Sequence, residues 1–350
     1  MDVRHGGDWV GFQARYGRPP LDFSASLSPL GLPEGVRRAA QAALEEANRY
    51  PDPQCRALRA SLGEYHRLSP EYILCGNGAA DLIFRLALAQ KPKRALLPAP
   101  TFGEYEHALE TMGCEVEHFF LEEKKNFQVT RELLERIVPG LDLLILCEPN
   151  NPTGQVTDHA LLRDILERCA QTGTLLAVDE CFLDFLPHPE EHSLIHEVPE
   201  HKNLLIFRAF TKCYAMAGLR LGYCLCADCA LLENMARMGQ AWGVSCVAQG
   251  AGLAALEEEA YLEKLRSLIR RERPLLQSGL EALGCRVIPG QANFLLFQSP
   301  VPNLRERLGE QGISIRSCRD FLGLGQGWYR VCVRTGEDNQ RLLSAIGEVR

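Results

Sequence analysis

One lysine of this chain lies in a stretch where an ammonium group is costly. Lys212 stands within FRAFTKCYAMAGLRLGYCLC (residues 207–226), a run rich in aromatic and aliphatic residues, whereas the other six lysines neighbour charged or polar residues. Desolvation lowers the pKa of a lysine and turns the ammonium into a nucleophilic amine. Such an amine is suited to Schiff-base chemistry with a carbonyl compound. The alternative is a lysine at a strand edge, whose apolar stem is covered and whose head reaches water.

Two further apolar runs end in polar side chains. In GTLLAVDECF, the apolar residues LLAV are followed directly by Asp179. A carboxylate in this position needs a cationic or hydrogen-bonding partner. LLILCEPNNPTG ends in a turn, rich in proline, that carries Asn151. For Asp179 the alternatives are a helix N-cap and a structural ion pair. A plain turn would explain the shape at Asn151, but not an amide aimed out of a sheet.

A third run, YILCGNGAADLIFRL, predicts a strand, a Gly-Asn-Gly turn and the start of a helix. The backbone N–H groups of Gly78, Ala79 and Ala80 would point at an anion, which the helix dipole also favours. Arg220, in the lysine-bearing stretch, supplies a cation for the same anion. The alternatives are a plain strand–helix turn and a dinucleotide site. The latter is disfavoured because Asp81 stands where G-x-G-x-x-G requires its third glycine.

These side chains need a frame that brings strand ends together. Short apolar runs alternate with helical patterns such as DHALLRDILERCAQTG, which predicts a mostly parallel sheet wound with helices. Polar groups at the carboxyl ends of such strands meet at one edge. After about residue 250, a long charged helix precedes the strands CRVIPG, NFLLFQ, ISIRS and WYRVCVR. We expect a large α/β domain over 34–250 and a smaller α+β domain over 251–350, joined by the irregular residues 1–33.

The predicted groups together describe one ligand. The lysine requires an aldehyde, the glycine turn and Arg220 require a phosphate, and Asp179 suits a ring nitrogen. Pyridoxal 5′-phosphate has all three, and a carboxylate that keeps its pyridine nitrogen protonated lets the ring act as an electron sink. Asn151 would donate to the phenolic oxygen of the ring.

The motif order GNGAAD, PTFGEYE, EPNNPTG, VDECFLDF and FTKCYAMAGLRLGY resembles the fold-type I pyridoxal-phosphate enzymes of the histidinol-phosphate aminotransferase group over nearly the whole chain. The resemblance implies an aspartate aminotransferase-like fold with a seven-stranded, mostly parallel sheet. It implies that Lys212 binds the cofactor covalently, that Phe102 stacks on the ring and that Thr211 joins the phosphate site. Tyr50 of NRYPDPQ resembles a tyrosine that reaches the phosphate of a partner subunit, which implies a homodimer. Arg330 of WYRVCVRT resembles the arginine that binds the substrate carboxylate.

Two positions depart from the pattern. Many relatives have a hydroxyl residue three positions before the lysine, where this chain has Ala209, so one hydrogen bond to the phosphate is missing. The aminotransferases usually carry a tyrosine in DEAY, and here Phe182 stands in DECF. Phe182 is therefore expected beside the ring without a hydroxyl for the phenolic oxygen.

The N-terminal motifs RHGGDWVGF and LDFSASLSPLGLP resemble the branch of this group that decarboxylates L-threonine O-3-phosphate in cobalamin biosynthesis. In SASLSP the usual asparagines of that branch are absent. A substrate phosphate needs several donors, preferably arginines. The candidates are His5, Gly6, Arg316 and Arg334.

O-phospho-L-serine is a second possible substrate of such a decarboxylase. Histidinol-phosphate transamination with glutamate or 2-oxoglutarate is the alternative reaction. A non-catalytic effector-sensing module, as in some transcription regulators, is a remote third possibility.

Charge and composition restrict the partners. A net charge of −7 and a pI near 5.8 leave no basic footprint for nucleic acid or a membrane surface. No apolar run approaches the roughly 20 residues of a membrane span. Fourteen cysteines scattered singly through apolar segments suit reduced thiols in a cytoplasm. No cysteine or histidine spacing predicts a metal site.

Overall fold

A computed structural model describes residues 5–350, whose strands form sheets of seven, four and two strands. Neighbours in the large sheet are parallel except where β8 meets β2 and β7. The predicted seven-stranded, mostly parallel sheet is therefore confirmed. In spatial order its strands are β2 (Ile73–Gly76), β8 (Gly222–Leu225), β7 (Leu204–Ala209), β6 (Leu175–Asp179), β5 (Leu143–Cys147), β3 (Arg94–Ala99) and β4 (Glu115–Phe120).

Six of these strands coincide with the apolar runs of the sequence, and β4 does not. Its sequence, EVEHFF, alternates polar and apolar residues, and no residue of the strand is fully buried. It lies at the edge of the sheet and pairs only with β3. An edge strand is partly solvated, so it lacks the continuous apolar run of the inner strands.

The large sheet is covered by helices on both faces, because successive side chains of its inner strands point to opposite sides. Leu144 and Leu146 of β5 belong to one apolar cluster, and Leu143 and Ile145 belong to another. The first cluster is covered by α3 (Arg56–His66), α6 (His159–Thr172), α8 (Cys246–Ala255) and α9 (Glu259–Ala282). The second is covered by α4 (Ala79–Gln90), α5 (Glu104–Thr111) and α7 (Cys229–Met238).

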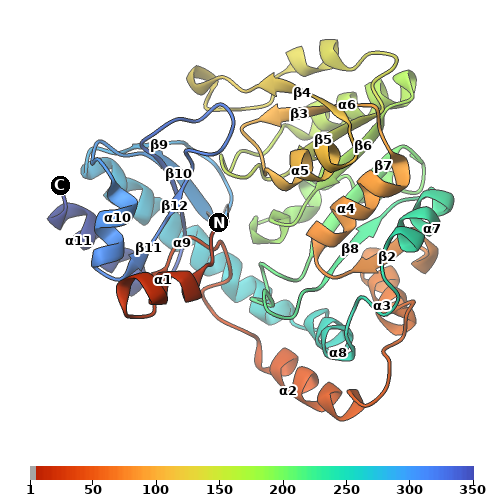
Figure 1. The fold of residues 1–350 in the computed structure, drawn as a ribbon, viewed down its shortest axis with the longest axis horizontal. Helices are drawn as coiled ribbons and strands as arrows, with labels where there is room; N and C mark the ends of the chain where they lie inside the picture. Colours follow the sequence, from red (N-terminus) through yellow and green to blue (C-terminus); the bar gives the residue numbers. More distant parts are fainter. Residues whose placement is uncertain (1–4) are drawn as a thin grey trace.

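The four-stranded antiparallel sheet lies to one side of the large sheet, with α10 and α11 beside it (Figure 1). Its strands, in spatial order, are β12 (Arg316–Ser317), β13 (Trp328–Cys332), β10 (Phe294–Gln298) and β9 (Arg286–Val287). The remaining helices are α1 (Trp9–Tyr16), α2 (Glu34–Ala43), α10 (Leu304–Glu310) and α11 (Gly336–Glu348).

The N-terminal residues differ from the irregular segment that we expected. Asp8 caps α1 by accepting from the Gly11 N–H, and Gly17 ends the helix with a φ of 72°. None of the helix residues is buried, so no apolar face marked the helix in the sequence. After it, β1 (Leu21–Asp22) pairs in parallel with β11 (Ile313–Ser314), which ties the two ends of the chain together.

One other expected element is divided in two. The run ISIRS was expected to be one strand, but its first part is β11 and its second part is β12, in different sheets. Only tertiary pairing distinguishes these two short strands from one continuous strand. The long charged helix expected after about residue 250 is present as the 24-residue α9, which contains Pro274.

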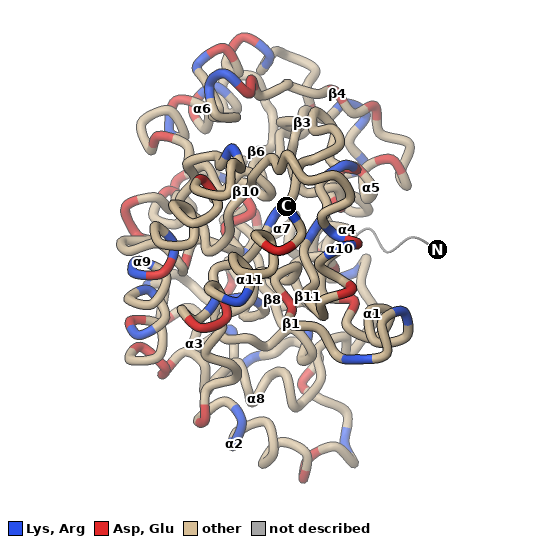
Figure 2. The backbone as a smooth tube through the Cα atoms, turned by 90° about the vertical axis from the view of Figure 1, so that its left-hand side faces the viewer, with Lys and Arg blue, Asp and Glu red and all other residues tan. Residues whose placement is uncertain are grey.

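Acidic and basic residues both occur along α9 (Figure 2). Among the described residues, no helix is both long enough and apolar enough to cross a membrane.

Candidate active site

A pocket lies where the loops after β5, β6 and β7 approach the four-stranded sheet and the N-terminal segment; we call it the central pocket. Residues far apart in the sequence line it together, as the sheet-edge argument predicts. The sequence-predicted residues that line it are His5, Gly6, Ala79, Ala80, Phe102, Asn151, Asp179, Phe182, Thr211, Lys212, Arg220, Arg316 and Arg330.

Lys212 follows the end of β7, and its side chain enters the central pocket. Its Nζ lies 5.6 Å from the centre of the Phe182 ring. Burial lowers the pKa of the Lys212 ammonium to about 8, and the positive charge of Arg330 acts in the same direction. About a tenth of this amine is therefore uncharged and nucleophilic at pH 7.

Asp179 is the last residue of β6 and is only 6% exposed. Its Oδ2 accepts a hydrogen bond from the Tyr105 hydroxyl at 2.5 Å, and its Oδ1 accepts from the Cys181 N–H at 3.0 Å. These contacts hold the carboxylate at the pocket, and within residues 5–350 it forms no ion pair. The adjacent Glu180 is different, because Arg208 pairs with it at 2.9 Å and makes it a structural ion pair.

Asn151 and its neighbour Asn150 have different surroundings. Asn150 is buried within its own turn, where its amide donates to the Pro100 carbonyl and the Thr153 hydroxyl, both at 3.0 Å. Asn151 lines the pocket, and its side-chain oxygen accepts from Arg330 Nη1. The NH₂ group of Asn151 is thus the donor that remains for a ligand.

An anion cradle forms at the start of α4. Gly78 precedes the helix with a φ of 84°, a conformation that side chains rarely adopt. A β-carbon at Gly78 would lie 2.6 Å from Arg220 Nη2, so the guanidinium lies directly against this turn. The N–H groups at the helix start, the Arg220 cation and the Thr211 hydroxyl form one polar end of the pocket.

His5 and Gly6 close another side of the central pocket. A β-carbon at Gly6 would collide with the carbonyl oxygen of Ser24, so only glycine permits this approach of two backbone segments. The His5 ring lies 5.8 Å from that of Phe102, and its Nε2 lies 2.8 Å from Glu104 Oε1.

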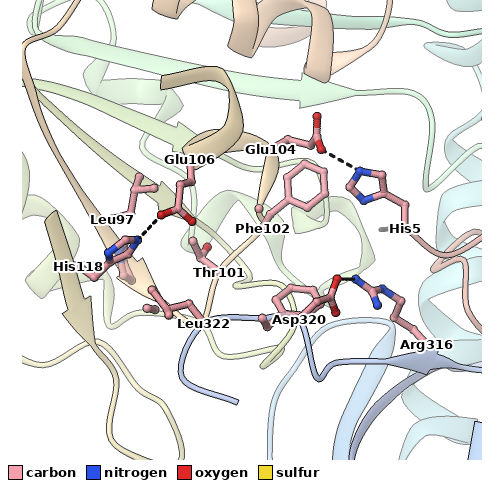
Figure 3. Close-up of a pocket in the computed structure, with 14 residues that line it drawn as sticks. His5, Leu97, Thr101, Phe102, Glu104, Glu106, His118, Arg316, Asp320 and Leu322 are labelled. Atoms are coloured by element: carbon pink, nitrogen blue, oxygen red, sulfur yellow. Dashed lines mark hydrogen bonds and ion pairs between the residues drawn. The ribbon is translucent and has the colours of Figure 1, made fainter. Parts of the chain in front are cut away.

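A second pocket adjoins the first and shares His5, Phe102, Arg316 and Phe321 with it; we call it the side pocket. Figure 3 shows three acid–base pairs around it. These are His5 with Glu104, His118 with Glu106 at 3.1 Å, and Arg316 with Asp320 at 2.7 Å. His5 and Arg316, which line both pockets, thus each contact a carboxylate.

Three of the predicted site residues do not line the central pocket. Gly78 does not line the pocket itself, and the Arg220 guanidinium lies directly against it. Tyr50 is 78% exposed, and its ring stacks on Trp242 with 4.4 Å between ring centres. Arg334 bonds to Asp338 at 3.0 Å and to the Asp22 carbonyl at 3.2 Å. These bonds tie Arg334 to its own helix start and to β1 rather than to the pocket.

Several residues that line the pocket were not predicted from the sequence, among them Ser24, Ser26, Tyr105 and Phe321. Tyr105 had a usable signal, since it follows Phe102 by three positions at the start of a helix, where such residues lie on one face. Phe321 had none, because a loop residue reaches the site only through the tertiary fold.

Two buried polar atoms of the pocket residues keep free hydrogen-bonding capacity. Ser26 Oγ and Arg330 Nε have no hydrogen-bond partner within residues 5–350. Such atoms are costly unless a ligand satisfies them. Over the same residues, no cluster of three or more His, Cys, Asp or Glu side chains is arranged to bind a metal.

Comparison with known proteins gives a consistent result. The model of the aminotransferase class I and II family matches residues 18–346. A threonine-phosphate decarboxylase of Salmonella typhimurium is 39% identical over 94% of this chain and 91% of its own length. A histidinol-phosphate aminotransferase of Symbiobacterium thermophilum is 34% identical over 93% and 89%. The crystal structure of the histidinol-phosphate aminotransferase from Clostridium acetobutylicum superposes with a TM-score of 0.87, at 27% identity, over 93% of this chain and 98% of that one.

Proposed function

Because the chain belongs to the aminotransferase class I and II family, we propose that it is a pyridoxal 5′-phosphate-dependent lyase. Its substrate is L-threonine O-3-phosphate and its product is (R)-1-aminopropan-2-ol O-phosphate, a step of cobalamin biosynthesis. The observation that carries the proposal is that one pocket holds an amine of lowered pKa together with two sets of potential anion-binding residues. The 39% identity to a threonine-phosphate decarboxylase supports the same choice.

The residues of the central pocket fit the cofactor. The Lys212 amine suits its aldehyde, the Asp179 carboxylate suits its ring nitrogen, and the Asn151 amide suits its phenolic oxygen. Ala79, Ala80, Thr211 and Arg220 would hold its phosphate, while Phe102 and Phe182 would contact its ring. When bound, this cofactor supplies an electron sink for the pair of electrons released from the substrate.

A phosphorylated substrate requires a second set of anion-binding residues, in addition to those that would hold the cofactor phosphate. His5, Gly6 and Arg316 line the same pocket as Lys212 and would hold the substrate phosphate. Arg330, fixed between Asn151 and the Ser24 carbonyl, would hold the carboxylate. Two fixed anions orient the amino acid, which decides which bond at Cα is cleaved.

The reaction then breaks the bond between Cα and the carboxyl carbon. CO₂ leaves, and a proton takes its place at Cα. Lys212 is the residue that would deliver this proton, because its amine lies in the pocket and its pKa of about 8 suits proton transfer near neutral pH.

The decisive experiment measures CO₂ and amino transfer in parallel. Purified holoenzyme given L-threonine O-3-phosphate is expected to release CO₂ without consuming a keto acid, and Lys212→Ala is expected to release none. Parallel reactions with O-phospho-L-serine and histidinol phosphate measure selectivity. Glutamate formation from 2-oxoglutarate without CO₂ would instead identify an aminotransferase, the second candidate, which the 34% identity to a histidinol-phosphate aminotransferase supports.

We extend the proposal to a cytoplasmic homodimer that binds neither nucleic acid nor membranes. Tyr50 would reach the cofactor phosphate of the partner subunit, which its exposure on the surface permits. Fourteen free thiols, twelve of them buried, suit a reducing compartment. We also propose the division into residues 34–250 and residues 1–33 with 251–350, which the pairing of β1 with β11 supports.

A further inference from the structure

We propose that Tyr105 is a positioning residue for the cofactor ring, which it holds by fixing Asp179 through its hydroxyl and Phe102 through its ring. The inference rests on the proposed function and adds a residue to it. Tyr105 lies in the first turn of α5, whereas Asp179 ends β6, so one side chain ties two elements of the site together.

The contact with Asp179 is short and fully enclosed. Tyr105 has no exposed surface, and its hydroxyl lies 2.5 Å from Asp179 Oδ2. The other carboxylate oxygen accepts from the Cys181 N–H. Each carboxylate oxygen accepts about two hydrogen bonds. Both oxygens are therefore anchored, and the carboxylate keeps acceptor capacity for a ligand.

The direction of this hydrogen bond is determined by charge. Burial, and next the charge of Asp179, raise the pKa of the Tyr105 hydroxyl well above its usual range. Tyr105 therefore keeps its proton and donates it to the carboxylate. Burial also raises the pKa of the neighbouring Cys147 and Cys181 thiols, which stay neutral. Tyr105 thus stabilises the Asp179 charge by a direct hydrogen bond, and the neutral Cys181 thiol also lies within hydrogen-bonding reach of this carboxylate.

The same ring supports Phe102. The two rings meet edge to face, with 5.5 Å between their centres and 83° between their planes. This is a favoured aromatic geometry. Phe102 would stack on the face of the cofactor ring and Asp179 would meet its nitrogen, so Tyr105 contacts both of the residues that define the ring plane.

Loss of the hydroxyl has two expected consequences. Asp179 loses a charge-assisted hydrogen bond and becomes free to rotate, so we expect Tyr105→Phe to bind pyridoxal 5′-phosphate about tenfold more weakly. A carboxylate that is free to rotate would also hold the protonated ring nitrogen less firmly, so the ring would carry less positive charge. The nitrogen that links Lys212 to the cofactor should then keep its proton to higher pH.

The experiment compares Tyr105→Phe with Tyr223→Phe. Tyr223 is a matched control because it is also a buried tyrosine, its hydroxyl lies 2.8 Å from His66 Nε2, and it does not line the central pocket. Cofactor affinity is measured by equilibrium dialysis of each protein, and the visible absorption band of the bound cofactor is titrated with pH. Thermal unfolding of each cofactor-free variant measures the purely structural cost.

We expect only Tyr105→Phe to show weaker binding and a band that titrates at higher pH. Equal affinities and equal titrations for the two variants would overturn the inference, even if both were less stable than wild type. A wild-type protein that takes up no cofactor at Lys212 would overturn the proposed function, and the inference with it.

Discussion

At residue 212, burial and a neighbouring cation act on one amine in the same direction. The amine is buried beside Phe182, and Arg330 enters the same pocket from β13. Both effects disfavour the ammonium form, which explains why a lysine was placed in so apolar a stretch.

The first prediction concerns the pH dependence of cofactor uptake. Only the neutral amine attacks an aldehyde, and the Lys212 pKa of about 8 lies below its usual value. Uptake by cofactor-free protein should therefore fall about tenfold per pH unit below about pH 8 and level off above it. Stopped-flow absorbance measures the rate. Arg330→Gln should move the profile to higher pH, and a rate independent of pH across this range would contradict the assignment.

The second prediction concerns the carboxylate that holds Arg316. Asp320 pairs with this arginine at the boundary of the two pockets, so a substrate phosphate must compete with it. Asp320→Asn should bind inorganic phosphate to the holoenzyme about three- to fivefold more tightly, as titration calorimetry would measure. Glu106→Gln is the matched control, because it removes a charge from the side pocket without touching the central one. Weaker binding in Asp320→Asn would mean that Asp320 positions Arg316 instead.

At the scale of elements, the anion cradle depends on how closely β8 approaches the start of α4. A β-carbon at Gly222 would lie 2.6 Å from the Ala79 nitrogen and 2.8 Å from the Gly78 carbonyl carbon. Both are backbone atoms, which do not move as a flexible side chain does. The cradle therefore requires glycine on a neighbouring strand as well as within its own turn.

The third prediction follows from this packing. Gly222→Ala should destabilise the protein by about 1–3 kcal/mol and also weaken cofactor binding, because the displaced atoms belong to the cradle. Gly218→Ala is the control, since a β-carbon there meets nothing within 4 Å. Its stability should change by no more than about 0.5 kcal/mol. Thermal unfolding and equilibrium dialysis measure the two effects. Unchanged cofactor affinity in Gly222→Ala would show that the contact between β8 and the start of α4 does not support cofactor binding.

At the scale of the whole molecule, the active site is expected to need two chains. Tyr50 does not line the pocket of its own chain, and its ring is instead held on the surface against Trp242. In a homodimer with shared sites, this stack would present Tyr50 to the partner.

The fourth prediction tests this sharing by complementation. Tyr50→Ala and Lys212→Ala should each be impaired alone. If Tyr50 serves the partner's site, a mixed dimer of the two variants contains one intact site, so unfolding and refolding them together should restore part of the activity. Sedimentation should give the mass of a dimer. A dimer without any restored activity would place Tyr50 outside the shared site.

The sequence alone was enough to predict the cofactor chemistry and the mostly parallel sheet that positions its residues. Lys212, Asp179, Asn151 and the turn before α4 were identifiable because each follows a short apolar run. Strands buried on both faces produce such runs, and parallel topology brings their carboxyl ends to one edge. The family resemblance is confirmed by the match over residues 18–346.

Only the tertiary structure decided which further residues reach the pocket. Tyr105, Ser26 and Phe321 lie there, whereas Arg334 is bonded elsewhere, although its neighbourhood resembled a substrate site. The edge strand β4 and the helix α1 were also missed, because neither is buried enough to carry an apolar pattern. The spacing of apolar residues along a segment indicates how far that segment is buried. It does not record which side chains from distant loops meet, because that depends on how the sheets and helices pack.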